Sequence, residues 1–370
     1  MIRLVVPDIN YGNLTELKDV INSGILTQGP VTKNFEHMVA DYCNVKYALS
    51  VNTATSALFL SALSLNLKKD DEVIVPDYTF PATANAVVTA GATPVLADID
   101  LDTYNLSTES ILENISEKTK AIMPVHQFGL SANMGDIVKI AKEHNLHILE
   151  DSACALGAEY KGKKCGSFGD VSCFSFHPRK IITTGEGGMI LTNDVKIKER
   201  CESLRNHGIV VSNNTRQVTS PGYNFRLSDI NSAIGVNQMK RLDDIINRRR
   251  KIAETMNKLL SDIEGIKIPI EPKGYKHTYQ SYVIMLDKNI NREKLIKLMF
   301  SKGVEATSGA MSVHCQPYYS KNYGYKLGAI QNSYYAFLHS LTIPMYPSLT
   351  SEDINLIASS LKSSIKDCFI

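Results

Sequence analysis

The middle of the chain alternates short apolar runs with segments of helical periodicity. Each apolar run is long enough for one buried strand, and each helical segment repeats its apolar residues every three or four positions. Such alternation is typical of a mainly parallel sheet that helices cover on both faces. The expected strands are 47–51, 72–76, 93–97, 119–125 and 146–150, and the expected helices are 55–64, 80–91 and 134–144. In such sheets, ligands bind at the carboxyl ends of the strands.

An arm is expected to precede this sheet. Helical segments at 14–23 and 31–43 are separated by a turn whose Gly29 and Pro30 prevent one continuous helix. Two further strands, near 170–176 and 188–192, and a helix at 194–206 follow the central alternation. The polar residues 209–221 then predict a mobile or partner-ordered loop.

A smaller α/β unit is expected at the end of the chain. A charged helical stretch, 228–263, leads away from the sheet, and we place the domain boundary inside it, near 245. The predicted domains are 1–245, the arm with the large domain, and 246–370, the small domain. The elements expected in the small domain are a strand at 279–286, a helix at 293–301, a strand at 304–307 and helices at 330–339 and 351–364.

The composition excludes several classes of protein. The chain has 370 residues, and 40 Lys and Arg against 38 Asp and Glu give a net charge of +2, which provides no basic surface for nucleic acid or an anionic membrane. No apolar run reaches the roughly 18 residues of a membrane span. The first ten residues carry one basic residue and no long apolar stretch, unlike a signal peptide, so we expect a cytoplasmic protein. The seven scattered cysteines indicate reduced thiols, with neither a disulfide framework nor a zinc site.

One lysine stands in an unusual setting. An apolar, aromatic run, 172–176, breaks at Pro178, presents Lys180, and passes into a glycine-rich turn before the apolar run that begins at Met189. Desolvation at such a place lowers the pKa of an amine and leaves it nucleophilic, as Schiff-base chemistry requires. The alternative is an ordinary surface lysine beside a loop.

Two further features would suit a phosphorylated, ring-shaped cofactor. Asp151 ends a buried strand and precedes small residues, so its carboxylate could face a pyridine nitrogen, although it could also cap the next turn. Thr55 and Ser56 begin a helix directly after a strand, where backbone N–H groups bind phosphate, although an ordinary helix cap is the commoner reason for such residues. Phe80 could stack on a ring or belong to the core, and His126 could face a site or be packed.

Taken in order, these residues resemble the sugar aminotransferases of the DegT/DnrJ/StrS family, which are pyridoxal-phosphate (PLP) enzymes of the aspartate-aminotransferase fold, PLP fold type I. The resemblance extends over almost the whole chain. Its main pieces are Gly29-Pro30, Gly91-Ala92-Thr93-Pro94, Glu150-Asp151-Ser152-Ala153, Ser175-Phe176-His177-Pro178-Arg179-Lys180, Thr183-Thr184-Gly185-Glu186-Gly187-Gly188, Asn206-His207-Gly208, Gly222-Tyr223-Asn224-Phe225-Arg226 and Pro344-Met345-Tyr346-Pro347.

The resemblance implies a role for each matching residue. Lys180 would be the Schiff-base lysine that also moves the proton, Asp151 the partner of the pyridine nitrogen, and Phe80 the stacked ring. Phosphate contacts would come from Thr55, Ser56 and Ser175, and from Asn224 of a neighbouring subunit, which would make the protein an obligatory homodimer. The residues expected to face the substrate are Gln28, His126, Gln280 and His314.

Two departures from the family pattern concern the cofactor. Cys154 stands where the family usually has a Gln or His that hydrogen-bonds the phenolic oxygen of PLP, and His126 or Gln127 could substitute for it. Ala54 stands where glycine is common. Relatives that dehydrate sugars have His at the position of Lys180, so the lysine favours transamination.

The activity that the resemblance implies is transfer of an amino group, with L-glutamate as donor, to a keto-sugar carried on a nucleotide, of the 4-keto-6-deoxy type. The alternatives are a catalytically idle or regulatory PLP-binding homologue and a PLP-dependent sugar dehydratase. A nucleotide-dependent oxidoreductase is disfavoured because no Gly-x-Gly-x-x-Gly fingerprint occurs. The nucleotide, the position of amination and a cyclitol ketone as substrate stay open.

Overall fold

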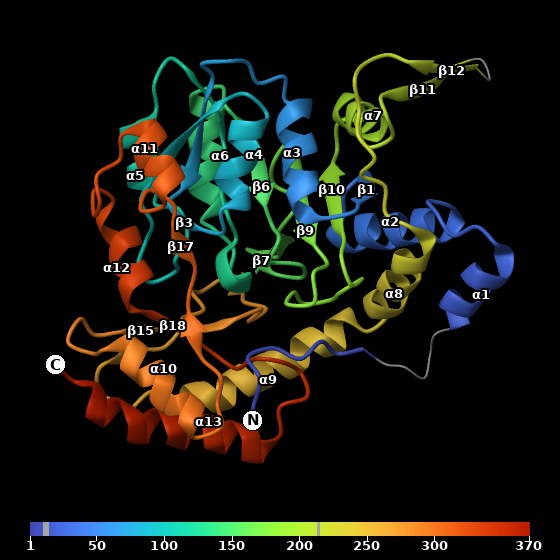
Figure 1. Cartoon of the computed structure of the whole chain (residues 1–370). Helices are drawn as coiled ribbons and strands as arrows, with labels where there is room; N and C mark the ends of the chain where they lie inside the picture. The colour runs from blue at the N-terminus through green and yellow to red at the C-terminus, as the bar shows by residue number, and fades with distance from the viewer. Residues whose placement is uncertain (10–14, 213–214) are drawn as a thin grey trace.

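A seven-stranded sheet forms the centre of the large part of the molecule in the computed structural model, which describes residues 1–9, 15–212 and 215–370 (Figure 1). The strands lie in the order β1-β10-β9-β6-β5-β2-β4. All run parallel except β10, which is antiparallel to both neighbours. The expected mainly parallel sheet is therefore confirmed. The strands are β1 Tyr47–Val51, β2 Glu72–Pro76, β4 Thr93–Ala97, β5 Thr119–Ile122, β6 His147–Asp151, β9 Val171–Ser175 and β10 Gly188–Thr192.

Helices cover both faces of this sheet because successive side chains of a strand point to opposite sides. On one face, Val73 and Val75 of β2 pack in the same core as three helices: α3 Ala54–Ser64, α4 Ala82–Thr89 and α7 Val195–Leu204. On the other face, Ile74 packs with α5 Thr108–Asn114 and α6 Met134–Glu143. Farther along that face, Phe174 of β9 packs with α2 Pro30–Cys43 and α8 Asp229–Met239.

The C-terminal part has a core of its own. A four-stranded antiparallel sheet, in the order β13-β15-β18-β16, packs against α10 Arg292–Ser301 and α13 Ser351–Ile365. Its strands are β13 Ile266–Lys267, β15 Tyr282–Leu286, β16 Thr307–Ser308 and β18 Ser340–Ile343. The start of the chain joins this part, because Ile2 is buried in the same core and pairs with Val304.

One helix connects the two parts. α9, Leu242–Leu260, packs Leu242, Ile245 and Ile246 in the core beneath the large sheet. Its later residues, from Ile252 to Leu260, pack in the C-terminal core. The change of core falls between Ile246 and Ile252, and we keep the domain division at residue 245 as a proposal.

The remaining elements are short. They are α1 Thr15–Ser23, α11 Pro317–Tyr323, α12 Gln331–His339, the 3₁₀ turns η2 Gln127–Gly129 and η3 Lys366–Cys368, and the strands β3 Tyr78–Thr79, β7 Glu159–Tyr160, β8 Lys163–Lys164, β11 Ile209–Ser212, β12 Thr215–Val218, β14 Tyr275–Lys276 and β17 Met311–Ser312. Leu14, part of the predicted helix 14–23, lies outside the described residues.

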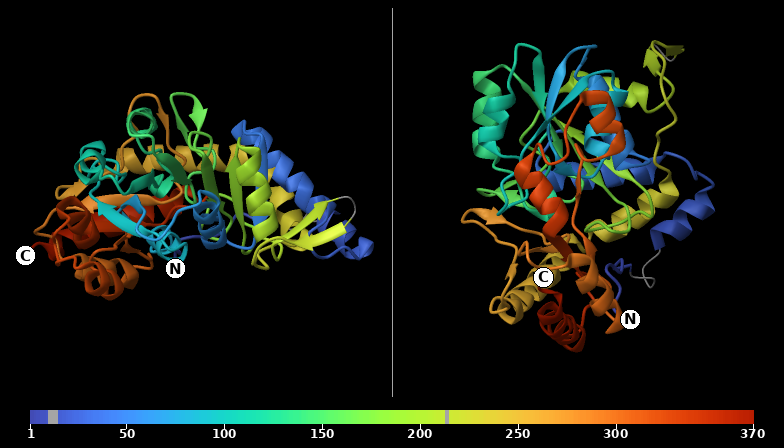
Figure 2. Two further views of the ribbon diagram at one scale, coloured as in Figure 1. Left: turned by 90° about the horizontal axis from the view of Figure 1, so that it is seen from above. Right: turned by 60° about the vertical axis from the view of Figure 1, so that its left-hand side comes forward.

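Three predicted elements differ from the structure. The stretch 228–263 is two helices that break at Lys240–Arg241, because Arg241 leaves helical geometry at φ −114°. The strand 119–125 ends at Ile122 as β5. In the segment 209–221, expected to be a loop, residues 209–212 and 215–218 pair as the strands β11 and β12, which extend away from the sheet (Figures 1 and 2). Residues 213–214 of this prediction lie outside the described residues. Val210, Val211 and Val218, which favour strands, are the residues that the polar composition of the segment obscured.

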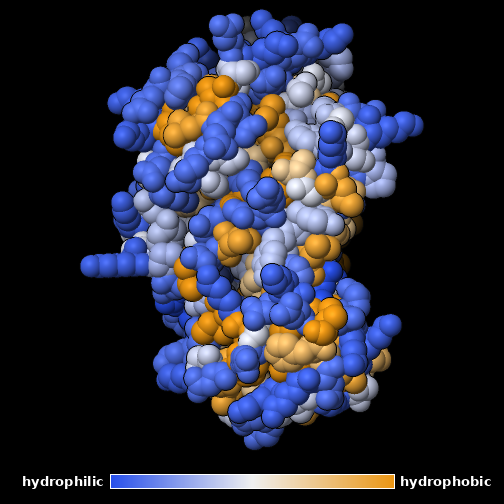
Figure 3. All heavy atoms as spheres, turned by 90° about the vertical axis from the view of Figure 1, so that its left-hand side faces the viewer, coloured by the Kyte–Doolittle hydropathy of each residue, from blue (hydrophilic) through white to orange (hydrophobic). Residues whose placement is uncertain are grey.

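On the side that carries α11 and α12, apolar atoms form separate patches between hydrophilic ones (Figure 3). Within the described part of the chain, no helix is long and apolar enough to cross a membrane.

Candidate active site

The register of the large sheet brings the candidate residues to one edge. Val51, the last residue of β1, pairs with Gly188, and Gly188 pairs with Ser175 at the end of β9. Asp151, at the end of β6, pairs with Cys173 of β9. The start of α3, the turn of Lys180 and the carboxylate of Asp151 therefore follow neighbouring strand ends.

Lys180 is held by its backbone and directed by its side chain. Its N–H donates to the carbonyl of His177 at 2.8 Å, and the residues that follow it, Ile181 and Ile182, are buried. Its Nζ donates to Sγ of Cys154 at 3.0 Å. The half-buried amine thus points toward the residues after β6 instead of into bulk water.

Asp151 is buried and oriented by hydrogen bonds. Thr83 Oγ1 donates to its Oδ2 at 2.8 Å, and the N–H of Ala153 donates to its Oδ1 at 3.1 Å. Thr79 Oγ1 lies 2.9 Å from Thr83 Oγ1, so two hydroxyls stand in line behind the carboxylate. Thr79 and Thr83 were missed in the sequence, because Thr79 lies in β3 and Thr83 in α4 and only the turn between them brings the two hydroxyls together.

Glu150 points to the other face of the strand, as the alternation predicts. It accepts hydrogen bonds from the backbone N–H groups of Gly166, Phe168 and Gly169, and lies 2.8 Å from Nε2 of His126. Burial alone would raise the pKa of Glu150, but the bonds from His126 and from these backbone groups outweigh it and lower the pKa. Glu150 is therefore a structural anion beside the candidate site.

The N-terminus of α3 forms a polar cradle. Thr53 caps the helix by accepting the N–H of Ser56 at 3.1 Å, whereas Thr55 in the first turn is exposed. The start of β10 lies close to this cap, since a Cβ on Gly188 would come within 2.5 Å of the Thr53 carbonyl. Oδ1 of Asn52, just before the cap, is buried without a hydrogen-bond partner. The expected cap is thus present, and the exposed Thr55 remains open to a phosphate.

Phe80 and Asn224 are exposed, unlike Ser175. The ring of Phe80 is 69% exposed, which excludes its alternative interpretation as a core residue and leaves a ring face for a planar ligand. Asn224 is exposed next to its bridge with Asn206. Ser175 is only 8% exposed, at the end of β9.

His126 and His314 correct two expectations about substrate contact, because both rings are fully buried and both of their nitrogens are engaged. Nδ1 of His126 accepts the N–H of Ala132 at 3.0 Å, so its Nε2–H donates to Glu150. Nε2 of His314 accepts the N–H of Gly328 at 3.1 Å, so its Nδ1–H donates to Asp77. Both are packed histidines. Their hydrogen-bond partners come from other segments of the chain. The sequence therefore did not reveal that the two rings are buried.

The two glutamines have different surroundings. Nε2 of Gln280 donates to the carbonyl of Arg179 at 2.7 Å, so this residue of the C-terminal part holds the turn that carries Lys180. Nε2 of Gln28 is buried without a hydrogen-bond partner, which leaves a donor for a ligand. The arm beside it is fixed, because the N–H of Gly29 donates to Asp229 at 2.8 Å.

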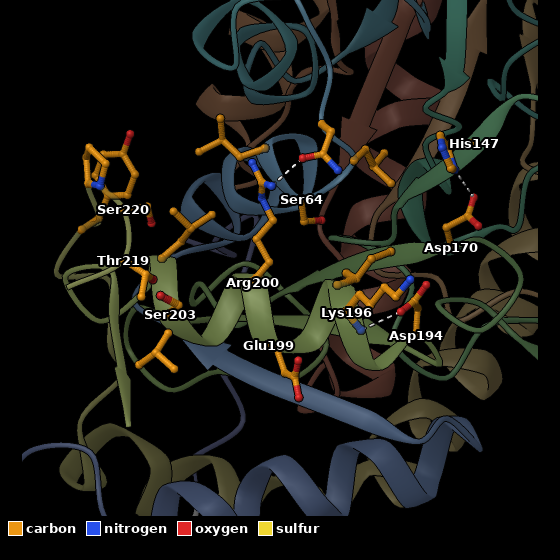
Figure 4. Close-up of a pocket in the computed structure, with 18 residues that line it drawn as sticks. Ser64, His147, Asp170, Asp194, Lys196, Glu199, Arg200, Ser203, Thr219 and Ser220 are labelled. Carbon is orange, nitrogen blue, oxygen red and sulfur yellow. Dashed lines mark hydrogen bonds and ion pairs between the residues drawn. The ribbon is translucent and has the colours of Figure 1, made fainter. Parts of the chain in front are cut away.

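A prominent hollow lies away from these residues. A hollow of about 830 Å³ opens between α7, the end of α3 and residues 219–223. It includes His147, which begins β6, and Asp170, which precedes β9, so it lies at the amino edge of the sheet, opposite Lys180 (Figure 4). Size alone therefore does not identify the site. In the ranges that the structure describes, His, Cys, Asp and Glu form no group of three or more that could hold a metal ion.

The assembled residues fit PLP. The amine of Lys180, the oriented carboxylate of Asp151 and the exposed hydroxyl of Thr55 at the start of α3 supply the groups that an aldehyde, a ring nitrogen and a phosphate require. Cys154 contacts Lys180 at the position where the family usually has Gln or His.

Comparisons with known proteins agree with this site. The model of the DegT/DnrJ/EryC1/StrS aminotransferase family matches residues 7–362. The chain is 34% identical to the spore coat polysaccharide biosynthesis protein SpsC of Bacillus subtilis, with 98% of this chain and 96% of the relative covered. It is 37% identical to the GDP-perosamine synthase of Escherichia coli O157:H7, with 93% and 92% covered.

Solved structures of aminotransferases are also similar to this chain. Helicobacter pylori PseC, an aminotransferase involved in the biosynthesis of pseudoaminic acid, superposes with a TM-score of 0.93 at 30% identity and 99% coverage of both chains. The putative sugar aminotransferase Spr1654 of Streptococcus pneumoniae in its PLP form has a TM-score of 0.93 at 27% identity, again with 99% of both chains covered. The chain therefore belongs to the DegT/DnrJ/EryC1/StrS aminotransferase family and is a PLP-dependent aminotransferase.

Proposed function

We propose that this enzyme transfers the amino group of L-glutamate to a nucleotide-linked keto-sugar of the 4-keto-6-deoxy type, as a homodimer in the cytoplasm. The names of its relatives, which include GDP-perosamine synthases and a polysaccharide biosynthesis protein, support a sugar substrate. The observation that carries the chemistry is the pair of Lys180 and Asp151 at neighbouring strand ends, with the amine directed toward the segment that follows Asp151.

The residues divide the work as follows. Asp151 would hold a proton on the ring nitrogen, Phe80 would cover one ring face, and Thr55, Ser56 and Ser175 would bind the phosphate together with Asn224 of the second copy. When bound, the cofactor supplies an electron sink that stabilises negative charge on the carbon next to the substrate nitrogen. Nζ of Lys180 takes a proton from one carbon and returns it to another, as a general base and then a general acid.

The test uses Lys180→Ala. With glutamate and a panel of UDP-, dTDP- and GDP-linked 4-keto-6-deoxy sugars, wild-type enzyme should aminate at least one member. The variant should be slower by at least about 1,000-fold because it lacks both the nucleophile and the proton carrier. Lys139→Ala, which removes an exposed lysine of α6, is the matched control and should keep full activity. A Lys180→Ala enzyme with wild-type turnover would refute the assignment.

The idle homologue is the second candidate, because Cys154 replaces the usual Gln or His. A titration with glutamate alone distinguishes an active aminotransferase from an idle homologue. An active enzyme converts its bound PLP to the pyridoxamine form in a stoichiometric absorbance titration, whereas an idle homologue leaves the spectrum unchanged. A sugar dehydratase is disfavoured by the lysine at position 180.

A further inference from the structure

Cys154 and Lys180 form a contact between a thiol and an amine. Sγ and Nζ lie 3.0 Å apart, and the two residues follow the neighbouring strands β6 and β9. The backbone on both sides is fixed. The N–H of Ala155 donates to the carbonyl of Ser152 at 2.8 Å, and the N–H of Lys180 donates to His177 at the same distance. The contact therefore requires no rearrangement of the main chain.

This thiol differs from the other six. Cys43, Cys165, Cys173, Cys201 and Cys368 are buried. Burial raises the pKa of Cys201 to about 12, which keeps that thiol protonated and inert. Cys315 is half-buried like Cys154, but its neighbours are the Ser312 hydroxyl at 3.3 Å and Nε2 of His314 at 3.4 Å. In the described ranges, Cys154 is thus the one cysteine whose sulfur contacts a lysine amine.

We propose that Cys154 and Lys180 are a site of oxidative modification, in which a peroxide joins them by a covalent sulfur–nitrogen bond. The sulfur of Cys154 first attacks hydrogen peroxide, the O–O bond breaks, and the sulfur becomes a sulfenic acid while the second oxygen leaves as water with the proton of the thiol. The nitrogen lone pair of Lys180 then attacks this sulfur. The S–N bond forms, the S–O bond breaks, and the hydroxyl leaves as water with a proton from the amine. Overall the thiol and amine lose two hydrogens and two electrons to the peroxide.

The bond would block the lysine that the cofactor needs. A dithiol such as dithiothreitol would free Lys180 by attacking the sulfur, so that the nitrogen leaves as an amine with the proton of the attacking thiol. The second thiol of dithiothreitol then displaces the mixed disulfide on Cys154, which releases the Cys154 thiol and oxidised dithiothreitol. Lysine that already holds PLP is not free for this reaction. The modification therefore belongs to the cofactor-free chain and to the stage of turnover in which Lys180 is released.

Mass spectrometry of the full-length protein tests the site. Cofactor-free protein treated with hydrogen peroxide should lose about 2 Da, the mass of two hydrogens. Digestion should yield one peptide pair joined between Cys154 and Lys180. Uptake of PLP should fall in proportion to the joined fraction, and dithiothreitol should reverse both changes. Protein that already holds PLP should show neither the mass loss nor the joined peptides.

Two variants distinguish the bond between Cys154 and Lys180 from general oxidation of the protein. Cys154→Ser should form no joined peptide and should take up PLP equally before and after peroxide. Cys315→Ser should still join Cys154 to Lys180. Wild-type protein that gains only oxygen on Cys154, with Lys180 unmodified, would overturn the proposal, and so would PLP-loaded protein that joins as readily as the cofactor-free form. Neither result depends on the sugar substrate.

Discussion

Two threonine hydroxyls set the orientation of the carboxylate that the cofactor requires. Thr83 donates to Asp151, and Thr79 stands behind Thr83, all within buried surroundings. A carboxylate that loses such a donor inside the protein is both less fixed and less well solvated. The hydroxyls therefore act through Asp151 and not on the substrate.

Replacing Thr83 with Val tests this orientation. The side chain keeps its shape but loses the donor, so we expect kcat/KM to fall about 5- to 10-fold, which corresponds to roughly 1 kcal/mol. The affinity for PLP should fall in parallel. Thr89→Val, which changes an exposed threonine at the other end of α4, is the control and should leave both quantities unchanged. Equal values for the two variants would exclude the proposed role of Thr83.

The charge of Glu150 makes the free energy of unfolding depend on pH. Its pKa is lowered in the folded chain, so its contribution to the free energy of unfolding is fully present above the unfolded value of about 4.3 and is lost as the pH falls through the lower, folded value. Glu150→Gln should destabilise the protein by about 3 kcal/mol at pH 7, because one acceptor then serves several buried donors. The difference from wild type should shrink below about pH 4.

Urea unfolding at a series of pH values measures this difference. Glu143→Gln, which changes a half-exposed glutamate of α6, should change stability by less than about 0.5 kcal/mol. A difference between Glu150→Gln and wild type that stays constant down to pH 3 would show that the charge of Glu150 does not matter.

At the scale of elements, one carboxylate joins two helix starts. α2 begins after Gly29, which has no side chain to cap it. Asp229, in the first turn of α8, instead accepts the N–H groups of Gly29, Val31 and Thr32. Negative charge is favourable at both helix N-termini, so Asp229 stabilises the two at once.

Asp229→Ala should therefore lower the free energy of unfolding by about 3 kcal/mol, since three N–H groups, of which that of Thr32 is fully buried, lose their acceptor. Chemical denaturation followed by circular dichroism measures this. Glu352→Ala removes an exposed acidic residue from the first turn of α13 and should cost less than about 0.5 kcal/mol. Similar costs for the two variants would contradict the capping role.

The elements were predictable where the pattern of burial is local. The strands that end at Val51, Asp151 and Ser175 agree with the expected apolar runs because each is buried on both faces. The break between α8 and α9 was not predictable, because the helical periodicity continues through Lys240 and Arg241. The hairpin β11–β12 was hidden because most residues of the segment 209–221 are polar.

At the scale of the whole molecule, the C-terminal part holds the turn of Lys180. The peptide unit between Arg179 and Lys180 is fixed at both ends, since its carbonyl accepts Gln280 Nε2 and its N–H donates to His177. Gln280 is fixed in turn by Arg249, a buried residue of α9 whose guanidinium donates to the carbonyls of Tyr279, Gln280 and Met345.

Gln280→Leu removes the bond to this peptide unit. We expect kcat to fall about 10-fold with little change in KM for glutamate, because the lysine is less well placed while binding is intact. The pH titration of the PLP absorbance should also shift. Gln331→Leu, an exposed residue at the start of α12, is the control. A change confined to KM would instead assign Gln280 to substrate binding, as the sequence had suggested.

The site was predictable as far as strand order determines it. Lys180 and Asp151 follow strand ends, and the sheet brings such ends together. His126 and His314 were misassigned because their partners, Ala132 and Gly328 among them, come from turns whose position only the folded chain reveals. The role of Asn224 in a second copy stays a prediction, since a single chain does not test it.

The pairing of Ile2 with Val304 has a consequence for the order of synthesis. The ribosome releases Ile2 first and the strands and helices around it last, so the smaller core closes only when nearly the entire polypeptide has emerged. Until then, the first turns of α9 and the large sheet are present without the complete C-terminal core. Met1 itself is exposed, so a tag fused ahead of it would leave the chain directly beside the core that closes last.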